Sequence, residues 1–447
     1  MEALYTLVGL FVALLVLRAA PPVLWLRYRH TVEWSRAVVL VWITWRVRQG
    51  WQRFCRETKL AILRREGRVT TRSALWAVMP GVRVERKAED RYAYPTLRVR
   101  CGPYGPVATV TTTPTASRAK LADLAPRIAD SWGCHRVEVE QPKPGKVRLR
   151  GIRYEPLADC VGSPLMANGQ PTVRPGQLSS TSSIHLAMDQ HGQPIEVTLA
   201  TSAHGLLAGV TRSGKSITVN TLLASASLMR DVRMVIIDPN LAAAAPWWRT
   251  AHRVSSDQHP SEATELLAEV RAEMETRQGL FWNGRTDQLT DFDEDLPLYL
   301  VVIDEVTNYT RHADKKAAEA FQAELLGLAS QGAKFGVRLW LIAQKPSADV
   351  VPTAVRTNLT SRVCHRVDTT EDFVHLFPDG RQLGISAADR EMPKGVSIAH
   401  VSGMRAPVRA KSVYLPTEAC WTISDALVDA GYQVRDLPGP VLTEAAA

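Results

Sequence analysis

The stretch GLLAGVTRSGKS at residues 205–216 decides the fold. Residues 205–208 are apolar and predict a short strand, residues 209–216 fit the pattern G-x-x-x-x-G-K-S, and residues 217–228 have helical character. A glycine-rich loop in this context lets backbone N–H groups surround a phosphate at the positive end of a helix. The stretch therefore predicts an α/β nucleotide-binding domain. We expect nucleotide contacts from Gly209, Thr211, Arg212, Ser213, Gly214, Lys215, Ser216 and Ile217.

Acidic and amide side chains follow other apolar strands. The predicted strand 298–303 ends at Asp304 and Glu305, and the predicted strand 338–343 ends at Gln344. The carboxyl ends of parallel strands share one edge of a sheet, where ligands bind. We expect Ser216 and Asp304 to bind Mg²⁺, and Lys215 to contact the β- and γ-phosphates. Glu305 is then the catalytic base for water and Gln344 the γ-phosphate sensor, so the sequence predicts hydrolysis of ATP with Mg²⁺.

The N-terminal segment predicts a membrane anchor over residues 1–56. Residues 3–17 are uncharged and mostly apolar, and the run continues past Arg18 to residue 26, which is long enough to span a bilayer. Arginines follow this run, so the positive-inside rule predicts a cell-membrane protein with the bulk of the chain, including the nucleotide-binding domain, in the cytoplasm. The shorter apolar run 37–45 predicts an interfacial helix or part of a second pass. The alternative for the segment is a buried core helix.

Composition limits the class of protein. A chain of 447 residues predicts two or three domains. A mean hydropathy of −0.10 and a single long apolar stretch exclude a polytopic membrane protein. Residues 1–180 carry 29 Lys and Arg against 13 Asp and Glu, whereas residues 181–447 carry 25 against 32. The basic first part therefore predicts a nucleic acid or an anionic membrane surface as partner, the alternative being a solvated basic face.

Residues 57–160 predict a small basic α+β domain. Residues 136–140 and 147–152 form a predicted hairpin whose second strand is basic, at Lys146, Arg148, Arg150 and Arg153. These side chains suit a phosphate backbone, and they equally suit a charge-protected edge strand. Residues 161–182 are rich in Pro, Gly, Ser and Thr and predict a linker.

The chain from about Ile184 to Leu415 resembles the FtsK/SpoIIIE family of DNA translocases. The matching pieces, in order, are GVTRSGKS at 209–216, VIIDPN at 235–240, EMETR at 273–277, LVVIDE at 300–305 and AQKPSADV at 343–350. With its N-terminal anchor, the chain looks most like the conjugative transfer proteins of actinobacterial plasmids and integrative elements. This resemblance implies a RecA-like P-loop ATPase over residues 183–416. It also implies a homo-oligomeric ring, usually a hexamer, that moves double-stranded DNA, with a short tail at 417–447.

The resemblance carries further expectations. Lys315 and Lys316 match a pore loop and are expected to contact DNA, the alternative being an exposed charged helix start. Ala333 stands where many relatives carry an arginine that acts across the subunit boundary, so Lys334, Arg338, Arg362 and Arg366 are the substitutes considered. The tail is shorter than a winged-helix domain, which implies that sequence-specific loading is either absent or delegated to accessory transfer proteins. A protein-secretion ATPase of the same family and a coupling protein that moves single-stranded DNA are the alternative functions.

Overall fold

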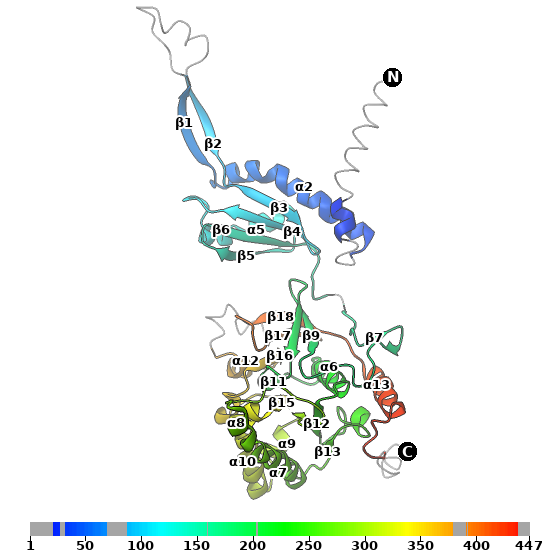
Figure 1. Cartoon of the computed structure of the whole chain (residues 1–447). Coiled ribbons are helices and arrows are strands. Elements are labelled where there is room, and N and C mark those ends of the chain that lie inside the picture. The colour runs from blue at the N-terminus through cyan, green and yellow to red at the C-terminus, as the bar shows by residue number, and fades with distance from the viewer. Residues whose placement is uncertain are drawn as a thin grey trace, which may run out of the picture. The chain divides into compact units, whose positions relative to one another are not determined.

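The computed structural model describes residues 21–26, 32–68, 87–158, 160–202, 204–378, 390 and 392–436. The chain divides into two compact units, residues 1–156 and residues 157–447 (Figure 1). Each unit has its own hydrophobic core, and each is described by itself.

The N-terminal unit is built on a four-stranded antiparallel sheet in the order β3-β4-β6-β5. Helices α2 and α5 cover one face of this sheet, so the predicted α+β class is confirmed. A separate antiparallel pair, β1 and β2, adjoins it in the chain. The elements are α2 (Trp34–Glu57), β1 (Ile62–Arg68), β2 (Lys87–Ala93), β3 (Leu97–Cys101), β4 (Pro106–Thr111), α4 (Arg118–Asp123), α5 (Ala125–Trp132), β5 (Arg136–Lys143) and β6 (Lys146–Ile152).

The apolar run 37–45 is one part of a longer helix, and its interpretation as an interfacial helix stays a prediction. These residues belong to α2, whose buried side chains recur every three or four positions along one stripe, whereas Trp42 and Trp45 are exposed. Ile43, Val47 and Trp51 on that stripe are buried in the core of the N-terminal unit. Trp51 also donates a hydrogen bond from Nε1 to the carbonyl of Pro95, at 2.9 Å. One side of this helix is therefore buried in the core, as the alternative interpretation expected, and its other side is exposed.

No helix among the described residues is long and apolar enough to cross a membrane. Most of the predicted span, residues 3–20, lies outside the described residues. Its last part, residues 21–26, is a helical turn whose Val23 and Leu26 are buried against Ala37 and Leu40 of α2. The described part of the predicted span thus packs on protein.

The C-terminal unit contains a ten-stranded sheet in the order β10-β9-β18-β17-β16-β11-β15-β14-β12-β13. The six strands from β16 to β13 are parallel, and the remaining four extend the sheet antiparallel. The strands are β9 (Ser183–Asp189), β10 (Pro194–Thr198), β11 (Gly205–Ala208), β12 (Val232–Ile237), β13 (Arg253–Ser255), β14 (Leu298–Ile303), β15 (Val337–Ala343), β16 (Ser361–His365), β17 (Val396–His400) and β18 (Val408–Ser412).

Helices cover both faces of this sheet. Alternate residues of β14 show the division, because Val301 packs with α7 and α10 whereas Val302 packs with α6 and α13. Buried parallel strands of this kind read as continuous apolar runs, which is why 298–303 was recognisable from sequence. The helical elements are α6 (Lys215–Ser227), η1 (Ala245–Trp247), α7 (Pro260–Thr276), α8 (Gln278–Gly284), α9 (Thr307–Thr310), α10 (Lys315–Gln331), η2 (Gly332–Phe335), α11 (Thr353–Arg356), α12 (Thr370–Leu376) and α13 (Thr417–Asp429).

The predicted linker 161–182 is wrong, because this segment packs on the C-terminal unit. It contains the short strands β7 (Met166–Ala167) and β8 (Gln170–Pro171), and Leu165 is buried in the core. Ser180 donates from its backbone N–H and its hydroxyl to the carboxylate of Asp231, at 2.7 Å each. The predicted tail is also corrected, since α13 buries Cys420 and Leu427 in the same core. The motor unit therefore extends from residue 157 through α13 rather than over 183–416.

Candidate nucleotide-binding site

The predicted phosphate loop connects β11 to α6, which begins at Lys215. Gly209 and Gly214 have φ angles of +152° and +118°, in the region that favours glycine. Neither position has room for a side chain. A Cβ on Gly209 would lie 2.7 Å from Cβ of His365, and one on Gly214 would lie 2.8 Å from Cα of Gly395. The glycines are thus required both by the turn and by the chain that packs against it.

Arg212 occupies a strained position in the loop. Its φ of +62° is left-handed, which costs a residue with a Cβ about 1–2 kcal/mol. The side chain is exposed.

Replacement of Arg212 by glycine should therefore stabilise the nucleotide-free chain. The strain relieved, about 1–2 kcal/mol, exceeds the entropic cost of a glycine, about 0.4–1 kcal/mol. A higher midpoint of thermal unfolding checks this. Arg230→Gly is the matched control, since Arg230 is exposed and has no positive φ, and it should lower the midpoint. A lower midpoint for Arg212→Gly would show that the arginine makes a stabilising contact.

Lys215 is held over the loop. Its Nζ donates to the carbonyl of Gly209 and, at 3.2 Å, to that of Val210. Burial lowers the pKa of Lys215, and the carboxylates of Glu305 and Asp304 oppose that shift. The amine therefore lies close enough to both acidic residues for their charges to act on it, in the loop where the lysine is expected to contact the β- and γ-phosphates.

Asp304 and Glu305 follow β14 at the same sheet edge. The backbone N–H of Asp304 donates to the carbonyl of Ile237 at 2.8 Å. Burial, with the charges of Asp238 and Glu305, raises the pKa of Asp304 to about 6. Asp238 has a structural role. Its carboxylate accepts hydrogen bonds from the backbone N–H groups of Asn240, Ala243 and Ala244, at 2.7–3.0 Å.

These residues fit a divalent cation. Hydroxyl and carboxylate oxygens are the ligands that Mg²⁺ prefers, and Ser216 and Asp304 supply one of each. Burial is the main cause of the raised pKa of Asp304, the charges of Asp238 and Glu305 add to it, and a bound cation would favour the ionised carboxylate. Ser213 adds a buried hydroxyl that has no hydrogen-bond partner among the described residues and that a phosphate oxygen would satisfy.

A proton and Mg²⁺ should compete for Asp304. Because its pKa is raised to about 6, the side chain is protonated below that pH and the metal must displace the proton. The apparent affinity for Mg²⁺ should fall about tenfold per unit below pH 6. Titration of Mg²⁺ at several pH values measures this. Asp304→Asn should bind Mg²⁺ weakly at every pH, and an unchanged pH dependence in that variant would assign the proton to another group.

Glu305 has a φ of +49°, which is uncommon for a residue with a side chain. Strained backbone of this kind gathers at functional sites, where the surrounding structure holds it. Here the next residue, Val306, donates its backbone N–H to the carbonyl of Ile342 on β15, at 3.0 Å. The acidic residue is therefore fixed by the neighbouring strand.

Gln344 is exposed and lies directly after β15. The carbonyl of Ala343 accepts the backbone N–H of Gly209, at 3.2 Å. The structure thus brings the predicted sensor to the start of the phosphate loop. Lys315 and Lys316 do not belong to this cluster. They are exposed in the first turn of α10, which Asp314 caps by accepting the backbone N–H of Ala317.

Sequence reasoning missed His365 at the end of β16. This side chain is fully buried and lies 3.1 Å from the hydroxyl of Thr218 on α6, which in turn lies 2.8 Å from that of Ser412. Burial, with the charge of Lys215, lowers the pKa of His365 to about 4, so the ring is neutral. The side chain packs directly against the phosphate loop at Gly209. The signal that could have found it is the apolar run at 363–364 ending in a polar pair, as in the other strands.

The three arginines considered as trans-acting residues differ in their exposure and in their contacts. Arg338 is only 4% exposed and donates to the carbonyls of Leu199, Ala200 and Ala333, so it is structural. Arg362 likewise donates to the carbonyls of Leu359 and Leu376. Arg366 is exposed, but its carbonyl accepts the N–H of Val210 at 2.8 Å, which places it beside the loop of its own subunit.

The strand order identifies the class of protein. The strand that leads to Gln344 lies between the phosphate-loop strand and the acidic strand, in the order β16-β11-β15-β14-β12. This arrangement, with Lys215, Asp304 and Glu305 at its carboxyl edge, defines a P-loop ATPase of RecA-like fold.

Comparison with known proteins gives the family. Residues 174–404 match the model of the FtsK/SpoIIIE family. The chain therefore belongs to the FtsK/SpoIIIE family, and the predicted resemblance is confirmed. It is 28% identical to the DNA translocase SftA of Bacillus subtilis (strain 168) over 66% of this chain and 31% of that protein. It is 24% identical to the DNA translocase FtsK of Halalkalibacterium halodurans over 69% of this chain and 40% of that protein.

The chain thus spans about a third to two fifths of the length of these relatives. Among solved structures, the pCW3 conjugation coupling protein TcpA, in its monomer form with ATPgS, is similar with a TM-score of 0.51 and 16% identity. That similarity covers 76% of this chain and 94% of the TcpA chain. At this identity the similarity supports the fold alone.

Proposed function

We propose that this chain hydrolyses ATP to move double-stranded DNA during conjugative transfer of a plasmid or integrative element. One observation carries the proposal: Lys215, Asp304, Glu305 and Gln344 converge at one sheet edge in a member of this family. The curated relatives are DNA translocases, and the similar solved structure is a conjugation coupling protein, which supports DNA as cargo. The chain would act as a ring, with six copies as the expected number, together with accessory transfer proteins.

The position of Lys315 and Lys316 supports a DNA contact. The start of a helix carries partial positive charge, so two lysines in the first turn of α10 are unfavourable for the helix itself. Both are exposed, and they follow closely in the chain on Arg311, His312 and Ala313, which line a hollow. Phosphate contacts made there would position a duplex without reading its sequence.

ATP turnover tests the proposed cargo. The full-length chain is assayed without DNA, with duplex DNA, with single-stranded DNA and with an unrelated peptide. Strong stimulation by duplex alone is expected. Stimulation only by single strands would favour the alternative of a single-strand coupling protein, and stimulation only by peptide would favour a secretion ATPase. Either result would overturn the proposal.

We also propose that residues 3–20 anchor the chain in the cell membrane, with both units in the cytoplasm. The tests must spare α2, since it is part of the N-terminal core. Deletion of residues 1–20 should release the protein from sedimented membranes without a loss of folding. Deletion of residues 1–56 should instead unfold the N-terminal unit. Continued sedimentation of the first variant would place the attachment elsewhere.

A further inference from the structure

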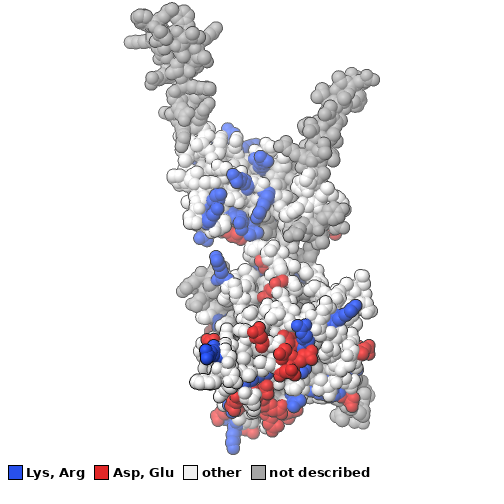
Figure 2. Space-filling model, viewed as in Figure 1, with Lys and Arg blue, Asp and Glu red and all other residues white. Residues whose placement is uncertain are grey.

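The basic strand β6 lies in the interior of its sheet. It pairs with β4 on one side and β5 on the other, so its charges do not protect an edge. That removes the alternative explanation for Lys146, Arg148 and Arg150. Figure 2 shows Lys and Arg side chains gathered on the N-terminal unit, whereas Asp and Glu are frequent on the C-terminal one.

The basic side chains share the face of the sheet that the helices leave open. Val147 and Leu149, which alternate with them along β6, are buried under α2 and α5. The cross-strand register places Arg148 opposite Thr109, and Thr109 opposite Arg98 of β3. It places Arg150 opposite Val107, and Val107 opposite Arg100. Residues directly opposite one another point to the same side.

We call Arg98, Arg100, Lys146, Arg148 and Arg150 the basic sheet face. Strand spacing puts the arginine pair of β3 about 10 Å from that of β6, and the members of each pair about 7 Å apart. This spread is close to the roughly 12 Å width of the major groove of B-DNA. The two pairs can therefore reach phosphates on both sides of one groove.

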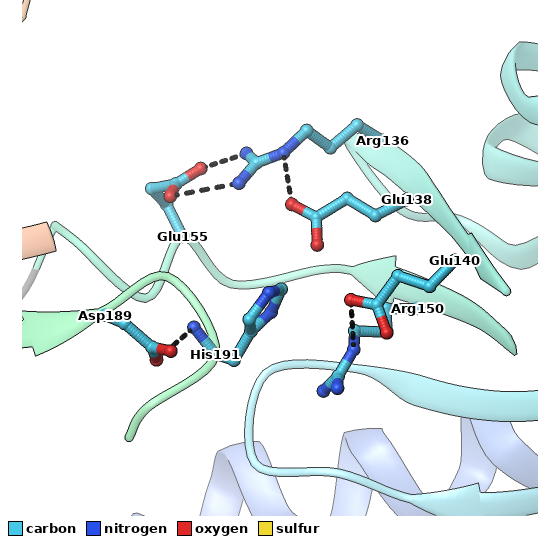
Figure 3. A network of polar contacts seen from close by, with 7 residues as sticks. All are labelled: Arg136, Glu138, Glu140, Arg150, Glu155, Asp189 and His191. Carbon is cyan, nitrogen blue, oxygen red and sulfur yellow. Dashed lines mark hydrogen bonds and ion pairs between the residues drawn. The ribbon is translucent and has the colours of Figure 1, made fainter. Parts of the chain in front are cut away.

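Carboxylates neutralise only part of this face. Glu140 accepts a hydrogen bond from Nε of Arg150 at 3.1 Å (Figure 3). The same carboxylate lies 3.6 Å from a guanidinium nitrogen of Arg148. One negative charge is thus shared by two arginines. Arg98 and Arg100 are exposed, and no carboxylate of the described chain pairs with either of them. The face keeps a net positive charge, concentrated on the edge strand β3.

The character of the face favours a polyanion over a lipid surface. Proteins that lie on bilayers combine basic residues with exposed aromatic and aliphatic side chains. In the described part of the N-terminal unit, the large exposed apolar side chains lie on α2, in the preceding turn and on the β1–β2 hairpin, and none lies on β3 to β6. A bilayer would therefore contact α2, which covers the opposite side of the sheet.

We infer that the basic sheet face binds the phosphate backbone of duplex DNA, as a second DNA site outside the motor. This inference rests on the proposed function only in choosing duplex DNA over other polyanions. Backbone contacts of this kind hold and orient DNA without reading its sequence. A site there would keep the duplex near the protein between cycles of hydrolysis by the C-terminal unit.

The test compares two charge-matched variants of the full-length chain. Arg98→Gln/Arg100→Gln alters the basic sheet face, and Arg118→Gln/Lys120→Gln removes the same charge from exposed positions on α4. Binding of a fluorescent duplex of about 30 base pairs is followed by anisotropy, without nucleotide, over a range of salt concentrations. Each lost phosphate contact lowers the slope of log K against log salt by about 0.9, so the first variant should lose about 2 units of slope. Its affinity at low salt should fall at least tenfold, and the control should match wild type.

Three results would overturn the inference. They are unchanged duplex binding by the first variant, equal losses in both variants, and a loss of binding to anionic phosphatidylglycerol vesicles while duplex binding persists. Thermal unfolding of each variant confirms that both are folded. Because binding is measured without nucleotide, failure here is distinguishable from failure of the proposed function, which concerns the stimulation of ATP turnover.

Discussion

Glu305→Gln should bind ATP with nearly wild-type affinity and hydrolyse it about 10²–10⁴ times more slowly. The amide keeps the size of the side chain and can still contact water, but it cannot accept the proton of that water. Glu305 lies beside Lys215 and Asp304. Among the described residues, none forms a hydrogen bond with its carboxylate, so this group is available to accept a proton. Asp238, in contrast, is occupied by three backbone N–H groups. Single-turnover hydrolysis, with nucleotide binding measured separately, gives both quantities.

A second substitution at this position separates chemistry from folding. Glu305→Gly removes the carboxylate and also relieves a φ of +49°, so the variant should be inactive and at least as stable as wild type. Glu294→Gln removes an exposed acidic group from the loop before β14 and serves as the control, with turnover unchanged. An unaltered kcat in Glu305→Gln would remove Glu305 as the base and leave the water to be activated by the phosphate itself.

The site edge could be predicted because it depends on local patterns. Residues 205–208 and 298–303 form strands over the ranges expected from their apolar runs, and the residues that follow them meet at one edge of the sheet. Parallel topology guarantees that meeting once the strands are assigned. His365 could not be found in this way. Its role depends on contacts with Thr218 and with the phosphate loop, which are distant in sequence.

The errors at the borders of the motor also have a physical cause. A segment rich in Pro, Gly, Ser and Thr reads as a linker because it has no periodicity, yet isolated apolar residues such as Leu165 and polar anchors such as Ser180 are enough to fix it. Helix α2 shows a second limit of the sequence patterns. Its apolar run 37–45 predicted an interfacial helix, and that pattern did not show that the stripe through Ile43 and Trp51 packs in the core of the N-terminal unit. Composition does not tell which side of a helix faces protein.

Lys215→Ala should abolish measurable hydrolysis and weaken ATP binding at least tenfold. The lysine supplies the charge for the β- and γ-phosphates, and its Nζ also holds the carbonyls of Gly209 and Val210. Alanine removes both functions, so the loop loses its contact with the side chain as well as its positive charge. Fluorescence of a labelled ATP analogue and steady-state turnover measure the two losses.

Lys215→Met keeps the length of the side chain but removes both its charge and the N–H donors that hold the carbonyls of Gly209 and Val210. Burial already disfavours the charged amine at this position, as the lowered pKa shows. The methionine variant should therefore unfold at a temperature no lower than wild type and still fail to hydrolyse ATP. Arg230→Ala removes an exposed cation just beyond the other end of α6 and should leave both properties unchanged. Wild-type turnover in Lys215→Ala would contradict the assignment of the phosphate loop, and with it the proposed motor function.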